Sequence, residues 1–224
     1  MFRVAADVHS IAFHGGALFA VSTGTDEIVA VTLDGPRMVA EDVIWRPEPD
    51  APRTDSHHLN ALAVSDDEIL VCGFGKRSEA LWSSARQGFI RTTRGKTLAS
   101  DLLQPHSLFL DESGVLYCES RVGAVRVVGE PSRVSSLPGY TRGLCRAGEF
   151  LYVGCSIGRR QSKSTGLMIE NSSDPGETAG LCGLGILCAD SWNSESFVDL
   201  AEYGDEIYDL LPLNPQQVFR KQGA

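Results

Sequence analysis

A chain of 224 residues is long enough for one domain with a core of ordinary size, without disulfides or a structural metal. The formal net charge of −9, with no basic run, makes nucleic acid and anionic membranes poor partners. The sequence contains no apolar run of about 18 residues that would predict a transmembrane helix. Its N-terminus, MFRVAADVHS, lacks the apolar stretch of a signal peptide, so we expect a cytoplasmic protein.

Short apolar runs of β type, separated by turn residues, follow one another along the chain. The clearest cover residues 10–33, 61–74 and 107–128, and each has the pattern of a strand, a tight turn and a second strand. Gly-Gly, Ser-Asp-Asp-Glu and Asp-Glu-Ser-Gly fill the turns, as hairpins require. Only residues 78–89 and 196–204 could be helical, and neither run is long enough for a helical layer. We therefore predict an all-β chain.

These segments recur as units whose first strands are similar. The units begin at His9, Asn60, His106, Arg142 and Tyr208. Their starts lie roughly 36 to 66 residues apart, and a period near 40–50 residues with several strands per repeat is typical of a β-propeller. We predict a single-domain propeller over residues 1–224 with about five blades, six being the alternative, in which the termini close the last blade. A β-sandwich would not require such a repeat.

The six cysteines are predicted to be reduced core residues. They are Cys72, Cys118, Cys145, Cys155, Cys182 and Cys188. None forms a CxxC pair, and most lie in apolar strand-like runs, where a free cysteine behaves as a small hydrophobe. No spacing supports a zinc site or a thiol nucleophile.

Polar residues gather where the units begin. The inner strands of a propeller line its channel, so their first residues meet at one mouth of that channel. The alignment brings to this mouth His9, His58, Asn60, His106, Arg142 and Glu206, with Tyr140 and Tyr208 beside them. Imidazole and carboxylate groups bind divalent metals, so a zinc, iron, manganese, nickel, copper or magnesium ion could be held there. Its predicted ligands are His9, His58, His106 and Glu206.

The same residues could bind a substrate and transfer protons. The predicted catalytic set is His58, His106, Glu206 and Tyr208, and the predicted substrate-binding set is Asn60, Tyr140 and Arg142. Structural roles stay open for each type of residue. A histidine at a strand start often bonds a neighbouring backbone carbonyl, tyrosines often only pack, and Arg142 could form an ion pair with Glu206.

Four motifs carry a resemblance to a known family. They are DSHHLNALAV, LLQPHSLFL, LPGYTRGL followed by YVGCS, and DEIYDLLPL, in this order. The chain resembles, from about His9 to Leu213, a bacterial family of uncharacterised predicted β-propellers described as domain of unknown function 4915. The resemblance implies a propeller and no established activity. Family members carry roughly one more blade before the segment matching DVHSIAF, which favours five blades over six here.

The mouth residues predict a small-molecule enzyme. Hydrolysis, elimination and isomerisation are the reactions that a His/Glu/Arg site, with or without a metal, would support. The alternative is a non-catalytic module that binds a small polar ligand or a partner protein. The sequence leaves the substrate and the oligomeric state open.

Overall fold

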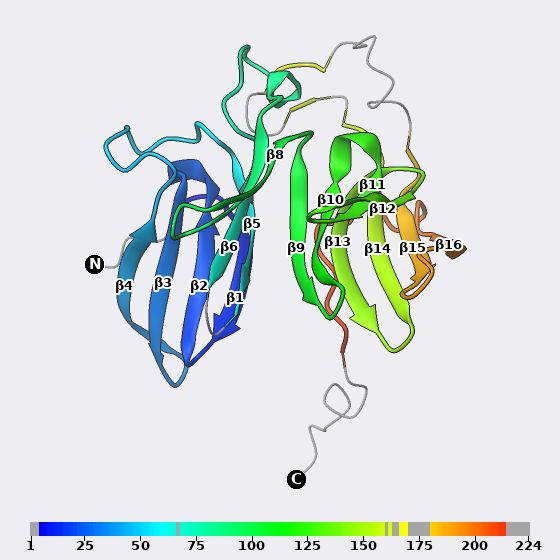
Figure 1. Cartoon of the computed structure of the whole chain (residues 1–224). Helices are drawn as coiled ribbons and strands as arrows, with labels where there is room; N and C mark the ends of the chain where they lie inside the picture. The colour runs from blue at the N-terminus through cyan, green and yellow to red at the C-terminus, as the bar shows by residue number, and fades with distance from the viewer. Residues whose placement is uncertain (1–4, 66–67, 160, 163–165, 170–179, 214–224) are drawn as a thin grey trace.

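Antiparallel β-sheets of four strands each are the building units of the fold (Figure 1). The computed structural model describes residues 5–65, 68–159, 161–162, 166–169 and 180–213. Within these residues there are four sheets, and in each sheet consecutive strands are neighbours. Every sheet is therefore a meander, which the alternating apolar runs and short turns of the sequence specify locally.

The four sheets follow one another along the chain. Blade 1 contains β1 (Val8–His14), β2 (Ala17–Ser22), β3 (Glu27–Asp34) and β4 (Arg37–Trp45). Blade 2 contains β5 (Leu59–Val64), β6 (Ile69–Gly73), β7 (Gly88–Thr92) and β8 (Thr97–Leu102). Blade 3 contains β9 (Pro105–Asp111), β10 (Gly114–Glu119), β11 (Ala124–Val127) and β12 (Glu130–Ser136). Blade 4 contains β13 (Tyr140–Ala147), β14 (Phe150–Ser156), β15 (Gly183–Cys188) and β16 (Ser194–Asp199).

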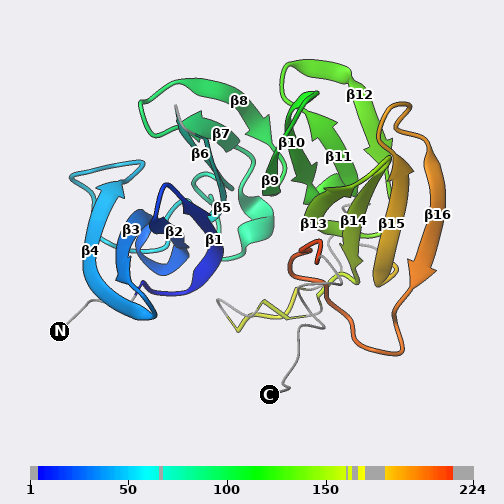
Figure 2. The ribbon, with the colours of Figure 1, turned by 90° about the horizontal axis from the view of Figure 1, so that it is seen from below.

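The blades stand side by side in an arc around a common centre (Figure 2). The first strand of each blade lies inside, so β5 contacts both β1 and β9, and β9 contacts β13. This propeller-like arrangement confirms the predicted architecture, but the described residues form four complete blades, so the prediction of about five is wrong. The unit that begins at Tyr208 supplies no paired strand within those residues.

Residues 205–210, here called the closing segment, occupy the place of a fifth inner strand beside blade 4. The Ile157 amide donates to the Asp205 carbonyl at 2.9 Å. The Ser156 hydroxyl contacts both the carbonyl and the amide of Ile207, at 3.1 and 3.0 Å. Gly143 has φ of +68°, and a Cβ there would lie 2.8 Å from the Asp209 carbonyl carbon. The absence of a side chain at Gly143 therefore lets the closing segment approach β13.

The described part of the N-terminus joins its own blade. The Ala6 amide donates to the Ser22 hydroxyl at 2.9 Å, and the Gly24 amide donates to the Ala6 carbonyl at 2.9 Å. Ala6 thus pairs with blade 1. The prediction that the termini close the last blade depends on residues outside those that the structure describes. Residues 1–4 and 214–224 lie outside the described residues.

Apolar side chains fill the spaces between the blades. Val21, Ile28, Leu59 and Val71 belong to one buried cluster between blades 1 and 2. A second cluster, between blades 3 and 4, contains Leu116, Val125, Leu144 and Val153, among others. Each such side chain, when fully buried, stabilises the fold by about 1.5–3 kcal/mol.

Five of the six cysteines are buried, as predicted, whereas Cys188 is only half-buried. All six are unpaired, and Cys72, Cys118 and Cys155 are fully buried on the second strands of blades 2, 3 and 4. Burial raises the pKa of Cys72 and of Cys155 to about 12, so these thiols stay protonated and unreactive at neutral pH.

The two runs that could be helical form no α-helix. Residues 78–89 contain only the three-residue turn η2 (Trp82–Ser84) and the start of β7, and residues 196–204 contain the end of β16 and the turn that follows it. Tertiary packing in a four-stranded meander overrides weak helical propensity there. The other helical turns among the described residues, η1 (Thr23–Thr25) and η3 (Ser120–Val122), are also three residues long, too short to cross a membrane.

Every inner strand changes register near its start. The pairing slips between Val8 and Ser10 in β1, between Leu59 and Ala61 in β5, and between Arg142 and Leu144 in β13. β9 slips opposite Leu116 and Cys118. A bulge of this kind turns a side chain out of the regular alternation, and bulges are common beside functional sites. The four irregularities all lie at the mouth where the polar residues were predicted to meet.

Candidate functional site

Seven side chains form a closed circuit around the channel mouth, which we call the mouth ring. Its members are His9, His58, Phe74, His106, Tyr140, Arg142 and Tyr208. Neighbouring rings have centroids 4.6 to 5.8 Å apart, and the Arg142 guanidinium carbon lies 5.0 Å from the Tyr140 ring centre and 5.6 Å from that of Tyr208. All four blades and the closing segment contribute, so the mouth ring exists only in the assembled arc.

A cavity of about 600 Å³ opens over the mouth ring, a volume usual for small-molecule sites. Of the predicted residues, the cavity is lined by His9, His58, Tyr140, Arg142, Glu206 and Tyr208. His106 and Asn60 lie directly behind this lining: the His106 ring contacts Tyr140 at 5.4 Å, and the side chain of Asn60 hydrogen-bonds that of His9. The structure therefore brings together every residue that the sequence placed at the mouth.

His58 is oriented by a carboxylate. Its Nδ1 lies 3.0 Å from Asp55 Oδ2 and 3.2 Å from Oδ1. A carboxylate only accepts hydrogen bonds, so Nδ1 carries a proton and the lone pair of the neutral ring is on Nε2. The ring is packed between Phe74 and Trp82, at centroid distances of 4.6 and 4.5 Å. His58 is thus held in one tautomer and one orientation at the wall of the cavity.

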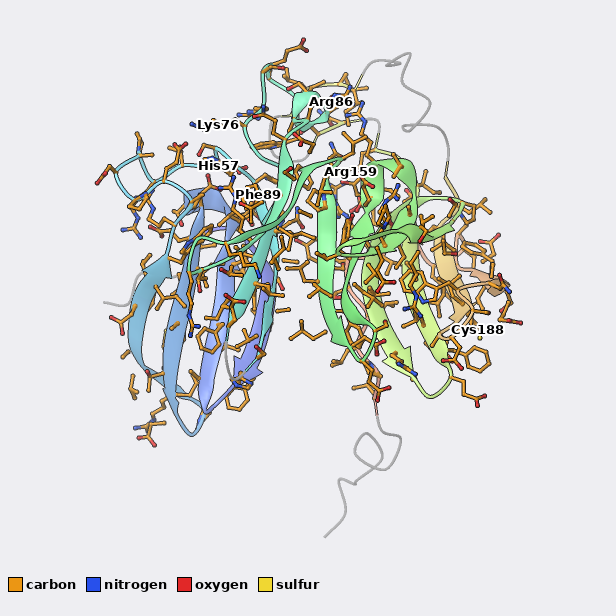
Figure 3. All side chains as sticks on the ribbon, in the orientation of Figure 1. His57, Lys76, Arg86, Phe89, Arg159 and Cys188 are labelled. Carbon is orange, nitrogen blue, oxygen red and sulfur yellow. The ribbon has the colours of Figure 1, made fainter. Side chains whose placement is uncertain are left out.

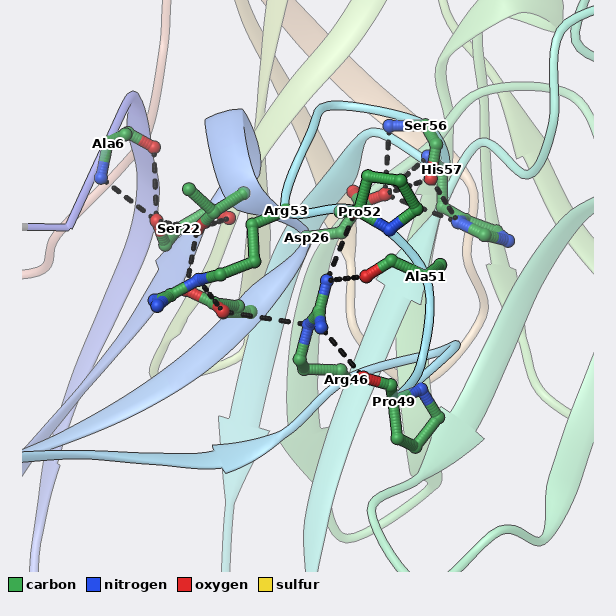
Figure 4. Close-up of polar contacts among 12 residues, drawn as sticks. Ala6, Ser22, Asp26, Arg46, Pro49, Ala51, Pro52, Arg53, Ser56 and His57 are labelled. Carbon is green, nitrogen blue, oxygen red and sulfur yellow. Dashed lines mark hydrogen bonds and ion pairs between the residues drawn. The ribbon is translucent and has the colours of Figure 1, made fainter.

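The loop that carries Asp55 is anchored to blade 1 (Figure 4). Asp26 Oδ2 accepts hydrogen bonds from the Ser56 amide at 2.8 Å and from the His57 amide at 2.7 Å. Arg46 donates to the carbonyls of Pro49 and Ala51 at 2.9 and 3.0 Å. His57 bonds Asp26 through Nδ1 at 3.2 Å, so its role is to fix the loop, while its neighbour His58 faces the cavity.

The pKa values of two imidazoles of the mouth ring are lowered. Burial, the adjacent His58 and Arg142 lower the pKa of His9, although Asp7 at 3.3 Å raises it. Burial and then the charge of Arg142 lower the pKa of His106 well below its ordinary value. His106 Nδ1 lies 3.0 Å from the Gln104 carbonyl, which can only accept, so Nε2 carries the lone pair.

Several buried polar atoms at the mouth have no hydrogen-bond partner among the described residues. They are Asn60 Nδ2, Trp82 Nε1, His106 Nε2 and Arg142 Nε. Three are donors, and only the His106 nitrogen is an acceptor. Leaving a buried polar group unbonded costs about 1–3 kcal/mol, so such groups are rarely clustered without a bound ligand or water. The unbonded groups at the mouth are therefore mainly donors, which acceptor atoms of water or of a ligand would satisfy.

Arg142 and Glu206 do not pair with each other. Glu206 instead forms a two-point ion pair with Arg159, with Nε to Oε1 and Nη2 to Oε2 both at 2.6 Å. No carboxylate of the described residues lies within ion-pair distance of Arg142. Figure 3 places Arg159 at the same end of the molecule as His57, with Cys188 far from both on blade 4. The alternative of a structural pair between Arg142 and Glu206 is therefore not found.

Comparisons with known proteins identify the family. The profile described as "Domain of unknown function (DUF4915)" matches residues 2–218, essentially the whole chain. The chain belongs to the DUF4915 family. No curated protein matches this DUF4915 member.

Solved structures resemble the DUF4915 chain in fold alone. A chain of the "Nidogen/Laminin Complex" is 12% identical with a TM-score of 0.61, over 92% of this chain and 68% of that one. A "Luciferin-regenerating enzyme" is 13% identical with a TM-score of 0.56, over 89% of this chain and 64% of that one. The DUF4915 chain thus spans about two thirds of these structures. At such identities the likeness extends to the arrangement of the sheets and not to activity.

A divalent metal finds no support in this geometry. The described residues contain no group of three or more His, Cys, Asp or Glu side chains that could hold a metal ion. Nδ1 of His58 and Nδ1 of His106 are hydrogen-bonded, and Glu206 is paired with Arg159. Nε2 of His58 and Nε2 of His106 keep their lone pairs.

Sequence reasoning missed five residues of the DUF4915 site. Phe74, Trp82 and Gln104 lie in or beside apolar runs, and nothing in their spacing distinguishes them from core residues. Gln104 accepts a hydrogen bond from the Tyr140 hydroxyl at 2.9 Å and so fixes that ring. Asp55 precedes His58 by three residues, a signal that was available. Arg159 lies 47 residues before Glu206 and could be found only in the fold.

Proposed function

We propose that this DUF4915 protein is a small-molecule enzyme that binds an anionic substrate at the channel mouth and transfers a proton to or from it. The observation that carries the proposal is that His58, oriented by Asp55, and Arg142, which lacks a carboxylate partner among the described residues, line the same cavity. General acid–base catalysis on a substrate that carries a carboxylate needs at least a base with a fixed lone pair and a cationic group that binds the carboxylate beside it.

Arg142 supplies binding and orientation. Its guanidinium lies against the rings of Tyr140 and Tyr208, which restrict its movement. A planar guanidinium binds a carboxylate through two parallel hydrogen bonds. Because the two aromatic rings already restrict the guanidinium, it loses little conformational entropy when the carboxylate binds. A substrate held this way would present its adjacent atoms to the histidines.

In this proposal His58 supplies the proton acceptor and Tyr208 supplies a donor. With Nδ1 bonded to Asp55, Nε2 can take a proton from a carbon acid or from a water molecule, and the carboxylate stabilises the imidazolium that forms. Burial raises the pKa of Tyr208, so its hydroxyl stays protonated and can donate to a developing oxyanion, whereas the Tyr140 hydroxyl already donates to Gln104. Hydrolysis, elimination and isomerisation all contain such a step, and none requires a metal in this arrangement.

Deuterium exchange tests the proposal directly. A panel of small oxo acids, which carry acidic C–H groups, is incubated with the protein in D₂O, and the loss of their C–H signals is followed by ¹H NMR. We expect exchange of at least one acid, and a decrease of about 10²-fold in His58→Gln, as for removal of a general base. His14→Gln, in a hairpin far from the mouth, is the matched control. Exchange that persists in His58→Gln would exclude His58 as the base.

The second candidate is a binding module without turnover. The observation that favours it is the cluster of unbonded donors on Asn60, Trp82 and Arg142, which would serve a ligand equally well without chemistry. Binding of an acid that depends on Arg142, without exchange or conversion of any acid in the panel, would favour the module over the enzyme.

A further inference from the structure

The cavity continues from the mouth ring onto an apolar surface, which we call the apolar wall. It consists of Val122, Leu137 and Leu181, all of which line the cavity. Two backbone hydrogen bonds hold the three together: the Leu137 amide donates to the Gly123 carbonyl at 2.7 Å, and the Leu181 amide donates to the Pro138 carbonyl at 2.6 Å. Tyr140 of the mouth ring follows Leu137 by three residues, so the apolar wall and the ring are continuous.

The apolar wall is exposed where its neighbours are buried. Val122 is 44% exposed and Leu181 is 47% exposed, whereas the residues beside Val122, namely Ser120 and Arg121, are at least 96% buried. Exposed apolar side chains inside a cavity that also holds polar anchors are typical of a ligand site. A carboxylate fills only a small part of about 600 Å³, so the rest of the ligand must contact other walls.

The charges of the lining limit the head group of the ligand. Among the residues that the structure describes, the charged side chains that line the cavity are Asp7, Arg121, Arg142, Arg159 and Glu206. Three arginines therefore stand against two carboxylates in this part of the lining. Arg159 is already neutralised by Glu206, and Asp55 adds a negative charge behind His58. Such a lining suits a monoanion better than the dianion of a phosphate monoester.

We propose that the ligand is an amphipathic monocarboxylate, with its carboxylate on Arg142 between the two tyrosines and its apolar chain on the apolar wall. This inference rests on the proposed function and names the class of molecule on which that function acts. It gives separate tasks to two parts of one cavity: the mouth ring selects the head, and the apolar wall selects the length of the chain.

Calorimetric binding of acetate, butyrate, hexanoate and octanoate tests the proposal, with octyl phosphate and 1-octanol as probes of the head. We expect affinity to rise by about fourfold for each methylene that contacts the apolar wall. Octanoate should bind more tightly than octyl phosphate or 1-octanol. A flat series, or tighter binding of octyl phosphate, would overturn the proposal.

Three variants locate the two ends of the ligand. Arg142→Gln should reduce octanoate affinity at least tenfold and bring it close to that of 1-octanol. Val122→Asn should flatten the chain-length series, whereas Val43→Asn, a position with the same 44% exposure on the outer strand of blade 1, should leave it unchanged. Equal effects of the two Val→Asn variants would contradict the assignment of the apolar wall, even if Arg142→Gln failed to fold.

Binding and exchange separate this inference from the proposed function. A steep, Arg142-dependent chain-length series without deuterium exchange of any oxo acid would support the amphipathic ligand and remove the enzyme. Exchange that depends on His58, together with a flat chain-length series, would support the enzyme and remove the amphipathic ligand.

Discussion

The two halves of the mouth are built from different chemistry. Blades 1 and 2 supply the imidazoles of His9 and His58, each beside a carboxylate, Asp7 at 3.3 Å and Asp55 at 3.0 Å. Blade 4 and the closing segment supply a guanidinium and two phenols, and their own carboxylate, Glu206, is neutralised by Arg159. In the proposed function, one half would transfer protons and the other would bind the charged group of the substrate. We therefore expect variants in the first half to impair proton transfer and variants in the second half to impair substrate binding.

The largest effect is expected from the anchor of the proton-handling half. Asp26→Ala removes the acceptor of the Ser56 and His57 amides at a buried position and leaves those donors unbonded. We expect a loss of about 3 kcal/mol in the free energy of unfolding, measured by urea denaturation. Asp42→Ala, on the exposed outer strand β4, should change it by less than about 0.5 kcal/mol. Similar values for both variants would show that the loop does not depend on Asp26.

The Asp55→Asn variant tests whether proton transfer and carboxylate binding depend on separate halves of the mouth. The amide can present its NH₂ group to His58, which would move the ring proton to Nε2 and block the base. We expect deuterium exchange to fall by at least about tenfold, with carboxylate affinity within twofold of the original, since Arg142 is untouched. Exchange and binding are measured on the same preparation. A parallel loss of binding would mean that the two halves are not separate.

Gly143→Ala tests the packing of the closing segment. A Cβ would lie 2.8 Å from the Asp209 carbonyl carbon and from the Leu210 amide nitrogen, and would displace the segment that carries Tyr208. Gly148 is a matched control, because its φ of +61° is as left-handed as the +68° of Gly143 but nothing lies within 4 Å. Both should lose about 1 kcal/mol from backbone strain, and Gly143→Ala about 1–2 kcal/mol more. Equal melting curves would show that the segment is not packed against β13.

The smallest effect expected is a pH dependence of stability. The pKa values of His9 and His106 are lowered in the folded protein, by burial above all, so below about pH 6.5 the unfolded chain binds protons that the folded chain does not. The free energy of unfolding should therefore rise with pH through this window and fall by about 1 kcal/mol from pH 7 to pH 5.5. Urea denaturation at several pH values measures it, and His106→Gln should show a smaller change.

Most of the mouth ring could be predicted from the repeat. His9, His106 and Arg142 begin similar apolar strands, and a propeller brings such starts together, so the convergence followed from the spacing of the units. Phe74 could not be found in this way. It follows the second strand of blade 2 and has the sequence context of a core residue. Its place in the ring depends on how blade 2 ends, which no local pattern encodes.

The blade count and the partner of Glu206 required the fold. Counting unit starts includes the one at Tyr208, but a start shows only that an inner strand is present and not that three further strands pair with it. The sequence offered only Arg142 as a partner of Glu206. The path of the chain after β14 places Arg159 beside the closing segment, where it pairs with Glu206.

The contact between His9 and Tyr208 bears on the order in which the protein folds. Each blade is a meander whose contacts join residues close in sequence, so each can form as soon as its own strands are available. The rings of His9 and Tyr208, 5.8 Å apart, belong to residues separated by about 200 positions, and closing so long a loop costs entropy that no local contact offsets. We expect the ligand cavity to be the last part of the molecule to assemble and the first to open. Ligand binding would then slow unfolding by holding together the two ends of the arc.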